Sequence, residues 1–199
     1  MPSTGHDVPD YKTAMIAVLA RLRVALGWAF GAPLLVLAHP TPMSLTIGVP
    51  IAACGEALRV WAAGHLNKAR EVTRSGPYRW VGHPLYVGST IIGAGVAVAS
   101  ASVPAAVLIA AYLAMTLTAA IKSEEAYLRR VFGEQYDLYK QGVAAKRASP
   151  GAAARRFSLR QAIANREHRA VVGLAIAILL LVLKATYNGM FWRAAAGPQ

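Results

Sequence analysis

The sequence predicts an all-α, polytopic membrane protein of one domain (1–199), with about five transmembrane helices arranged around a core helical hairpin. Hydrophobic residues make up 56% of the 199 positions, mean hydropathy is positive at +0.41, and the charges gather in a few segments. This composition lies outside the range of ordinary soluble domains. In addition, residues 85–121 contain no Asp, Glu, Lys, Arg or His. As one helix they would run about 55 Å, nearly twice the roughly 30 Å of a hydrocarbon core, so they must fold back on themselves.

The hairpin divides into predicted spans at 85–100 and 103–121. The turn is marked by the run Ser100-Ala101-Ser102-Val103-Pro104, because its proline lacks a backbone donor and ends the first helix. At the far end, Ala120, Glu124 and Leu128 recur at helical spacing, which predicts that the second helix continues beyond the membrane. The residues that flank the hairpin therefore meet on one membrane face.

Three further spans are predicted at about 15–38, about 43–64 and about 170–190. The last has only fourteen uninterrupted apolar residues before Lys184, but Tyr187, Phe191 and Trp192 then resemble an interfacial aromatic belt, which favours crossing. The first ten residues are polar, so no removable signal peptide is expected. Tyr136 and Tyr139, three apart, predict a short amphipathic helix in a C-terminal segment, followed by a basic linker at 144–156.

The formal charge of +12 is explained by membrane orientation and not by nucleic-acid binding, because the basic residues lie beside apolar spans. Residues 122–169 hold eleven Lys and Arg residues, whereas the connections at 39–42 and after the third span hold none. The N-terminus and the site are therefore expected to face the cytoplasm. Cys54 is the one cysteine, so there is no disulfide framework. Membrane lipids are the expected surroundings; neither nucleic acid nor a metal is expected as a partner.

Candidate chemistry begins at His83, whose position before Pro84 pushes its backbone away from helical values and places the imidazole at the mouth of a helix. Glu124 and Glu125 lie at the C-terminal end of the hairpin, where the helix dipole disfavours acids, so they need another reason to be there. The position of Glu125 is explained without a functional role by an i,i+4 ion pair with Arg129 on a solvated helix face. Glu124 lies on the apolar side and is the better candidate for a buried acceptor.

Glu56 and Arg59 lie within the second predicted span, where charges are costly unless they are paired or line a cavity. Mutual neutralisation and the wall of a substrate chamber are both open interpretations. Gly88, Gly93 and Gly95 on the third span predict close helix packing.

In these residues the sequence resembles the isoprenylcysteine carboxyl methyltransferase family and its phospholipid-methyltransferase-like relatives. The resemblance covers a core signature region, which we place at residues 55–143. Its elements are Gly76-Pro77-Tyr78, His83-Pro84 with Tyr86 and Gly88, and Glu124-Glu125 with Leu128, Phe132, Gly133, Tyr136 and Tyr139.

The resemblance implies a membrane enzyme that transfers the methyl group of S-adenosylmethionine to a lipophilic small molecule or a lipidated substrate. It implies that the cofactor is held by Arg70, Glu71, Val72, Thr73, Tyr78, His83, Pro84, Leu85, Tyr86 and Glu124. Candidate substrate residues are Glu56, Arg59, Arg79 and Lys122. No catalytic side chain is assigned, because methyl transfer to a carboxylate needs placement and exclusion of water more than a general base.

Two departures affect the acceptor. Gly82 and Ala120 stand where the family has arginines, and arginine is suited to bidentate carboxylate binding. A lipid amine, a thiol or another lipophilic acceptor therefore stays open beside a prenylcysteine carboxylate. Two other classes of protein also stay open: an NADPH-dependent enzyme similar to the sterol reductases, and a non-catalytic membrane protein with a vestigial pocket.

Overall fold

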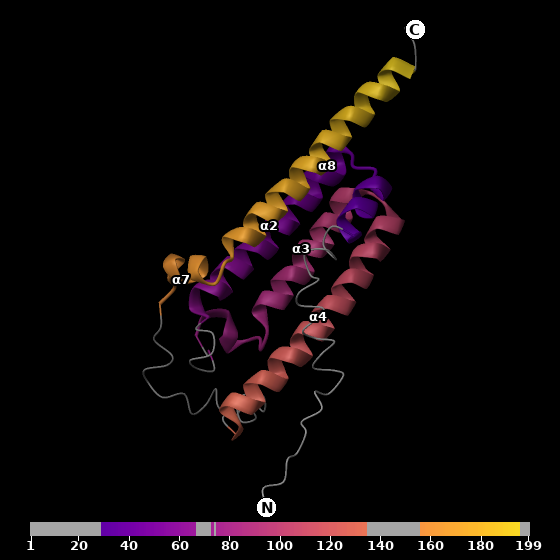
Figure 1. Cartoon of the computed structure of the whole chain (residues 1–199). Coiled ribbons are helices and arrows are strands. Elements are labelled where there is room, and N and C mark those ends of the chain that lie inside the picture. Colours follow the sequence, from indigo (N-terminus) through magenta and orange to yellow (C-terminus); the bar gives the residue numbers. More distant parts are fainter. Residues whose placement is uncertain (1–28, 67–72, 74, 135–155, 196–199) are drawn as a thin grey trace, which may run out of the picture.

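A computed structural model describes residues 29–66, 73, 75–134 and 156–195, and every element in these ranges is helical. Residues 29–37 form the described part of a first helix. The elements that follow are α2 (Pro42–His65), the 3-10 helix η1 (Gly76–Arg79), α3 (Pro84–Ser100), α4 (Val103–Phe132), α7 (Leu159–Ala164) and α8 (His168–Ala195), as Figure 1 shows. The all-α prediction is confirmed for this part of the chain.

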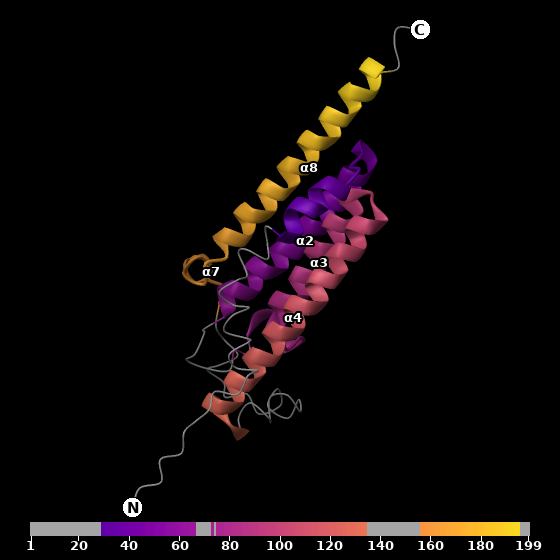
Figure 2. The ribbon, with the colours of Figure 1, turned by 45° about the vertical axis from the view of Figure 1, so that its right-hand side comes forward.

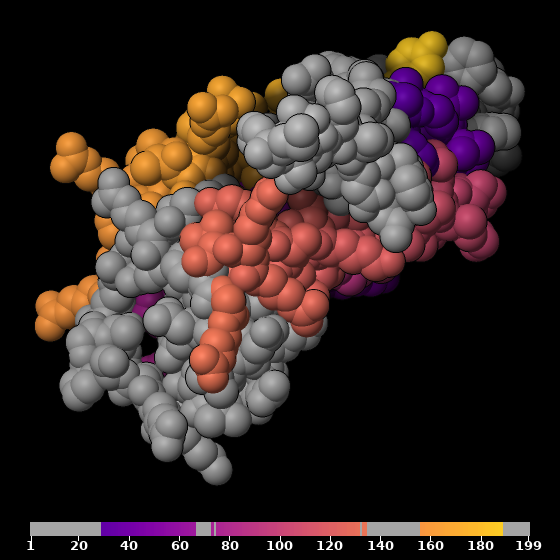
Figure 3. Space-filling model, turned by 60° about the horizontal axis from the view of Figure 1, so that its bottom comes forward, coloured from indigo at the N-terminus to yellow at the C-terminus, as the bar shows by residue number. Residues whose placement is uncertain are grey.

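The long helices alternate in direction, so that the bundle has two distinct ends. Figures 1 and 2 show α2, α3 and α4 side by side, with α8 running along the other side of α2. One end, called here the signature end, holds the end of α2, η1, the start of α3, the end of α4 and α7. Figure 3 turns this end toward the viewer, with the end of α4 near the middle of the view and the orange residues, α7 among them, at the left.

Glycines let α2 and α3 approach until their backbones nearly touch. A Cβ added at Gly48 would lie 2.5 Å from the carbonyl oxygen of Gly95, and one added at Gly55 would lie 2.7 Å from that of Gly88. Real Cβ atoms do not approach so closely, so only glycine fits at these crossings. The predicted role of the small residues in helix packing is confirmed for Gly88 and Gly95.

The hairpin turn lies where the sequence places it. The α3 helix ends at Ser100, Ala101 takes a left-handed conformation with φ of 47°, and Ser102 caps α4 by accepting a bond from the Ala105 amide at 3.4 Å. The His39 amide donates to the Ser100 carbonyl at 2.8 Å, which ties this turn to the connection before α2. The α4 helix then runs to Phe132, which confirms that it continues beyond residue 121.

Three helices of the described part are long and apolar enough to cross a membrane: Pro42–His65, Val103–Val131 and His168–Asn188. The predicted span at 85–100 is the shorter apolar helix α3, whose 17 residues cover about 25 Å. Most of the span predicted at about 15–38, the helix predicted around Tyr136 and nearly all of the linker at 144–156 lie outside the described residues. The composition and these helices together indicate a membrane protein.

The short helix α7 was not predicted, and it closes the end of α2. Ser158 caps α7, accepting a bond from the Gln161 amide at 3.3 Å. The Gln161 side chain then donates to the Leu66 carbonyl at 3.0 Å, and that of Asn165 donates to the Ala63 and Leu66 carbonyls at 2.8 Å. These carbonyls are among those that a helix end leaves without intrahelical partners.

Lys184, which interrupts the apolar run of α8, has a similar role at the opposite end. Its ammonium donates to the carbonyls of Leu35 at 2.5 Å and Val36 at 2.8 Å, in the last turn of the first helix. A cation is favoured there by the helix dipole as well as by these bonds. The lysine therefore joins two helices and does not end the apolar segment as a membrane boundary would.

Candidate functional site

The two halves of the sequence signature meet at His83. Its Nδ1 lies 3.7 Å from a carboxylate oxygen of Glu124, and its Nε2 lies 3.6 Å from one of Glu125. The first residue precedes α3 and the other two lie on α4, so the hairpin fold alone brings them together. We call these three side chains the His-Glu cluster.

Local sequence explains the position of each member. His83 occupies the N-cap of α3 with φ of −132° and ψ of 65°, as expected before a proline, and Pro84 is fully buried in the first turn. The α4 helix continues to Phe132, so Glu124 and Glu125 lie about two turns before its end, where the dipole of their own helix acts on them little. They face the start of α3 and an imidazole that can carry a positive charge, which accounts for acids at these positions.

The cluster favours the protonated imidazole. The interaction with the Glu124 carboxylate is the largest cause and raises the pKa of His83 above its ordinary value, burial opposes this, and the Glu125 carboxylate adds to the rise. The side chains of His83 and Glu125 are each 23% exposed and that of Glu124 is 37% exposed. The protonated imidazole would thus share a partly open site with two carboxylates.

Tyr86 extends the cluster along α3. Its ring centroid lies 5.6 Å from that of His83, and Glu124 lies within interaction range of its side chain. Tyr78 is buried, by contrast, in an apolar cluster with Ala62 and Leu66, against which Leu85 packs. Tyr78 and Leu85 therefore serve the packing between η1, α2 and α3 as well as standing beside the site.

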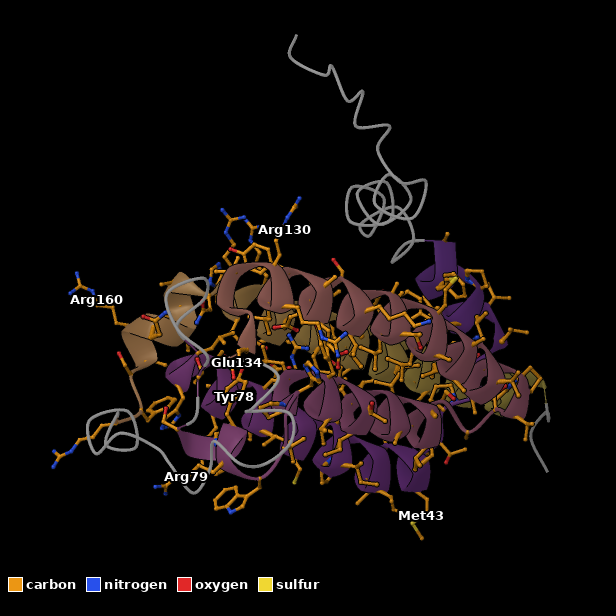
Figure 4. All side chains as sticks on the ribbon, turned by 90° about the horizontal axis from the view of Figure 1, so that it is seen from below. Met43, Tyr78, Arg79, Arg130, Glu134 and Arg160 are labelled. Carbon is orange, nitrogen blue, oxygen red and sulfur yellow. The ribbon has the colours of Figure 1, made fainter. Side chains whose placement is uncertain are left out.

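The remaining candidates are scattered. Thr73 is buried near the signature end, whereas residues 70–72 lie outside the described residues. Arg79 and Lys122 are exposed. Figure 4 shows Tyr78 inside the bundle and Arg79 projecting outward at the same end, with Met43 at the opposite end. The structure thus brings His83, Tyr86 and Glu124 together and leaves Arg79 and Lys122 at the surface.

Arg59 is the centre of a second polar group, which includes one residue that sequence reasoning missed. Its Nε lies 2.7 Å from Glu167 on the loop before α8 but 3.7 Å from Glu56, the partner expected from the i,i+3 spacing. Its guanidinium also donates to the Ser89 hydroxyl of α3. Simple neutralisation of Glu56 by Arg59 is therefore incomplete, because Glu167 holds the guanidinium more closely.

Sequence reasoning also undervalued Glu125, which it treated as a solvated partner of Arg129. Glu125 is as near to His83 as Glu124 is. Adjacent residues on a helix project about 100° apart, so a ring approaching between them contacts both. Among the described residues, no group of three or more His, Cys, Asp and Glu side chains is arranged to hold a metal ion.

Part of the chain that contains this site is similar to a known protein family. Residues 43–135 match the model of the family described as phospholipid methyltransferase. The match covers just under half of the chain, and it is this part of the chain that is similar to the family. The family is part of the membrane methyltransferase group that resembles the isoprenylcysteine carboxyl methyltransferases, so the resemblance seen in the sequence is confirmed.

One curated relative matches over a similar length. The nickel-cobalt-cadmium resistance protein NccN of Alcaligenes xylosoxydans xylosoxydans is 34% identical over 95 residues, which are 47% of this chain and 43% of the relative. The match therefore spans less than half of either protein. No solved structure matches this chain.

The phospholipid methyltransferase region contains both halves of the His-Glu cluster and ends before α7 and α8. Membrane methyltransferase activity is what the match to this family suggests. Glu167, α7 and α8 are additions to the matched region, and they pack on its α2 helix.

Proposed function

We propose that the protein transfers a methyl group from S-adenosylmethionine to a lipophilic acceptor that reaches the site from the bilayer. The observation that carries the proposal is that His83, just before α3, lies beside Glu124 and Glu125 of α4, all within the region that matches the family. The signature end faces the cytoplasm in this proposal, as the distribution of Lys and Arg predicts.

The donor groups of the site suit the cofactor. Carboxylates at Glu124 and Glu125 accept hydrogen bonds from ribose hydroxyls or from an ammonium group, and the Tyr86 ring offers an apolar face to a base. When bound, S-adenosylmethionine would supply an electrophilic methyl group on a sulfonium. In this proposal Glu124 and Tyr86 hold the cofactor, and His83 fixes the positions of the two acids. Residues 70–73 are proposed to complete the pocket.

We do not propose a prenylcysteine carboxylate as the methyl acceptor. Gly82 and Ala120 replace the arginines of the family pattern, and a Cβ added at Gly82 would meet nothing within 4 Å. Of the basic residues that could take their place, Arg79 and Lys122 are exposed, and Arg59 is held by Glu167 and Ser89. These features support a lipophilic acceptor without a carboxylate, such as an amine or a thiol, over an anionic one.

The test is a calorimetric titration of the purified protein in detergent with S-adenosylhomocysteine. We expect saturable binding that is lost in His83→Ala and kept in His39→Ala, because His39 is exposed and lies at the opposite end of the bundle. A folded wild-type protein that binds no S-adenosylhomocysteine would contradict the proposal. NADPH would then be titrated, since binding of the dinucleotide favours the reductase alternative and binding of neither favours a vestigial pocket.

A further inference from the structure

A groove of about 640 Å³ lies between α2 and α8, and no residue of the His-Glu cluster lines it. Its walls are apolar along nearly their whole length and it is open on one side. Alanines at 53, 57 and 175 leave the space that larger side chains would fill. The other lining residues are Glu56, Val60, Trp61, Phe157, Val171, Leu174 and Ile178. A volume of this size is typical of sites for small organic molecules.

Glu56 is the acidic residue in this apolar wall. The residue is 7% exposed, and neither carboxylate oxygen has a hydrogen-bond partner among the described residues. Among the described residues it forms an ion pair with Arg59, whose Nε is 3.7 Å away and which gives its close contacts to Glu167 and Ser89. A buried carboxylate without hydrogen bonds is costly, so this group needs a donor.

The charges of the surrounding group point to the nature of that donor. Glu56 and Glu167 share the guanidinium of Arg59, so with all three side chains ionised the group would carry one net negative charge. They lie within or next to helices that can cross a membrane, where an unbalanced charge is especially costly. A ligand with a cationic, hydrogen-bond-donating head would both balance this charge and give the Glu56 carboxylate a hydrogen-bond donor.

We propose that the groove binds a single-chain amphiphile whose primary ammonium pairs with Glu56 and whose alkyl chain lies between α2 and α8. Val60, Leu174 and Ile178 provide the apolar surface along which the alkyl chain lies, and the ammonium supplies the hydrogen-bond donors that the Glu56 carboxylate lacks. Because α8 lies outside the phospholipid methyltransferase region, family membership does not account for this site. The proposal does not depend on methyl transfer.

The experiment uses dodecylamine carrying a photoreactive diazirine in mid-chain, with the protein in phosphatidylcholine nanodiscs. Labelled positions are mapped by mass spectrometry. We expect saturable labelling within residues 53–61 and 171–178, reduced by unlabelled dodecylamine and unaffected by dodecanoic acid. In Glu56→Gln the apparent affinity should fall by about tenfold or more, as expected for the loss of a hydrogen bond between two charged groups.

Two further variants separate the groove from general damage. Ala175→Trp fills the space from the exposed face of α8 without altering Glu56, and it should abolish the labelling. Glu134→Gln removes an exposed acid elsewhere and should leave the labelling unchanged. Labelling spread over the outer face of α4, equal in all variants, would overturn the proposal, as would crosslinks between copies of the chain through the groove. If Glu56→Gln fails to fold, Ala175→Trp decides alone. No readout uses methylation, so failure of the proposed function would leave the result standing.

Discussion

Arg59→Ala should be among the most damaging single substitutions in the bundle, because it leaves two buried acids without their shared cation. The Arg59 side chain is 20% exposed, and the side chains of Glu56 and Glu167 are 10% and 8% exposed. Removing one partner of a buried ion pair costs roughly 3–5 kcal/mol, mostly because the remaining charge stays buried and unpaired. Here the remaining charges are two, so the upper part of that range is expected.

The assay is thermal unfolding of the purified protein in detergent. For a chain of about 200 residues, 1 kcal/mol shifts Tm by roughly 2–4 °C, so Arg59→Ala should lower Tm by about 6–20 °C. The matched control combines Arg59→Ala with Glu56→Gln and Glu167→Gln, which removes all three charges and should recover most of the lost stability. Glu56→Gln alone should be neutral or slightly stabilising, since it removes the unbalanced charge.

The reasoning would be refuted if Arg59→Ala and the combined variant unfolded at the same temperature. In that case the loss would come from the packing of the Arg59 stem, which lies against Gly88, and not from charge.

Two other predictions concern the His-Glu cluster and the helix crossing. Because the pKa of His83 is raised in the folded state, the stability that its charge contributes is complete below pH of about 6.5 and is lost as pH rises through the raised value. Tm measured from pH 6 to 9 should therefore fall more in the wild type than in His83→Gln, and equal slopes would contradict the cluster. Gly95→Ala should destabilise by about 1–3 kcal/mol, because its Cβ would lie 2.7 Å from the Gly48 carbonyl oxygen. The control is Gly173→Ala in α8, where an added Cβ would meet nothing within 4 Å, so the change should be neutral or stabilising by up to about 1 kcal/mol. If Gly95→Ala and Gly173→Ala lowered the denaturation midpoint equally, helix contact would be excluded as the cause.

The sequence predicted the hairpin well because its signals are local. The structure confirms the fold-back of the uncharged stretch and the His-Pro at the start of α3, whereas Pro104, expected to end the first helix, lies in the first turn of α4. The meeting of His83 with Glu124 follows from the hairpin itself.

Long-range contacts were less accessible to sequence reasoning. Glu167 is 108 residues from Arg59, and no periodic pattern links them, so the i,i+3 pair with Glu56 was the expected partner. The same limit applies to α7, whose six residues are too few for a periodic signal and whose position depends on the carbonyls at the end of α2. Lys184 had been interpreted through hydropathy alone, whereas its contacts with Leu35 and Val36 come from the arrangement of helices.

The unpaired state of Glu56 results from a competition between two acids for one guanidinium, and this competition can be tested. Glu167 holds Arg59 at 2.7 Å and leaves Glu56 at 3.7 Å. In Glu167→Gln the guanidinium is released from its stronger partner, so Arg59 should pair with Glu56 as the i,i+3 spacing alone predicts. The groove would keep its shape and its acid but lose its net negative charge. Labelling by the photoreactive dodecylamine should then weaken in Glu167→Gln although Glu56 is unchanged. Undiminished labelling would show that the charge balance of the three residues does not govern the groove, and that Glu56 alone determines binding.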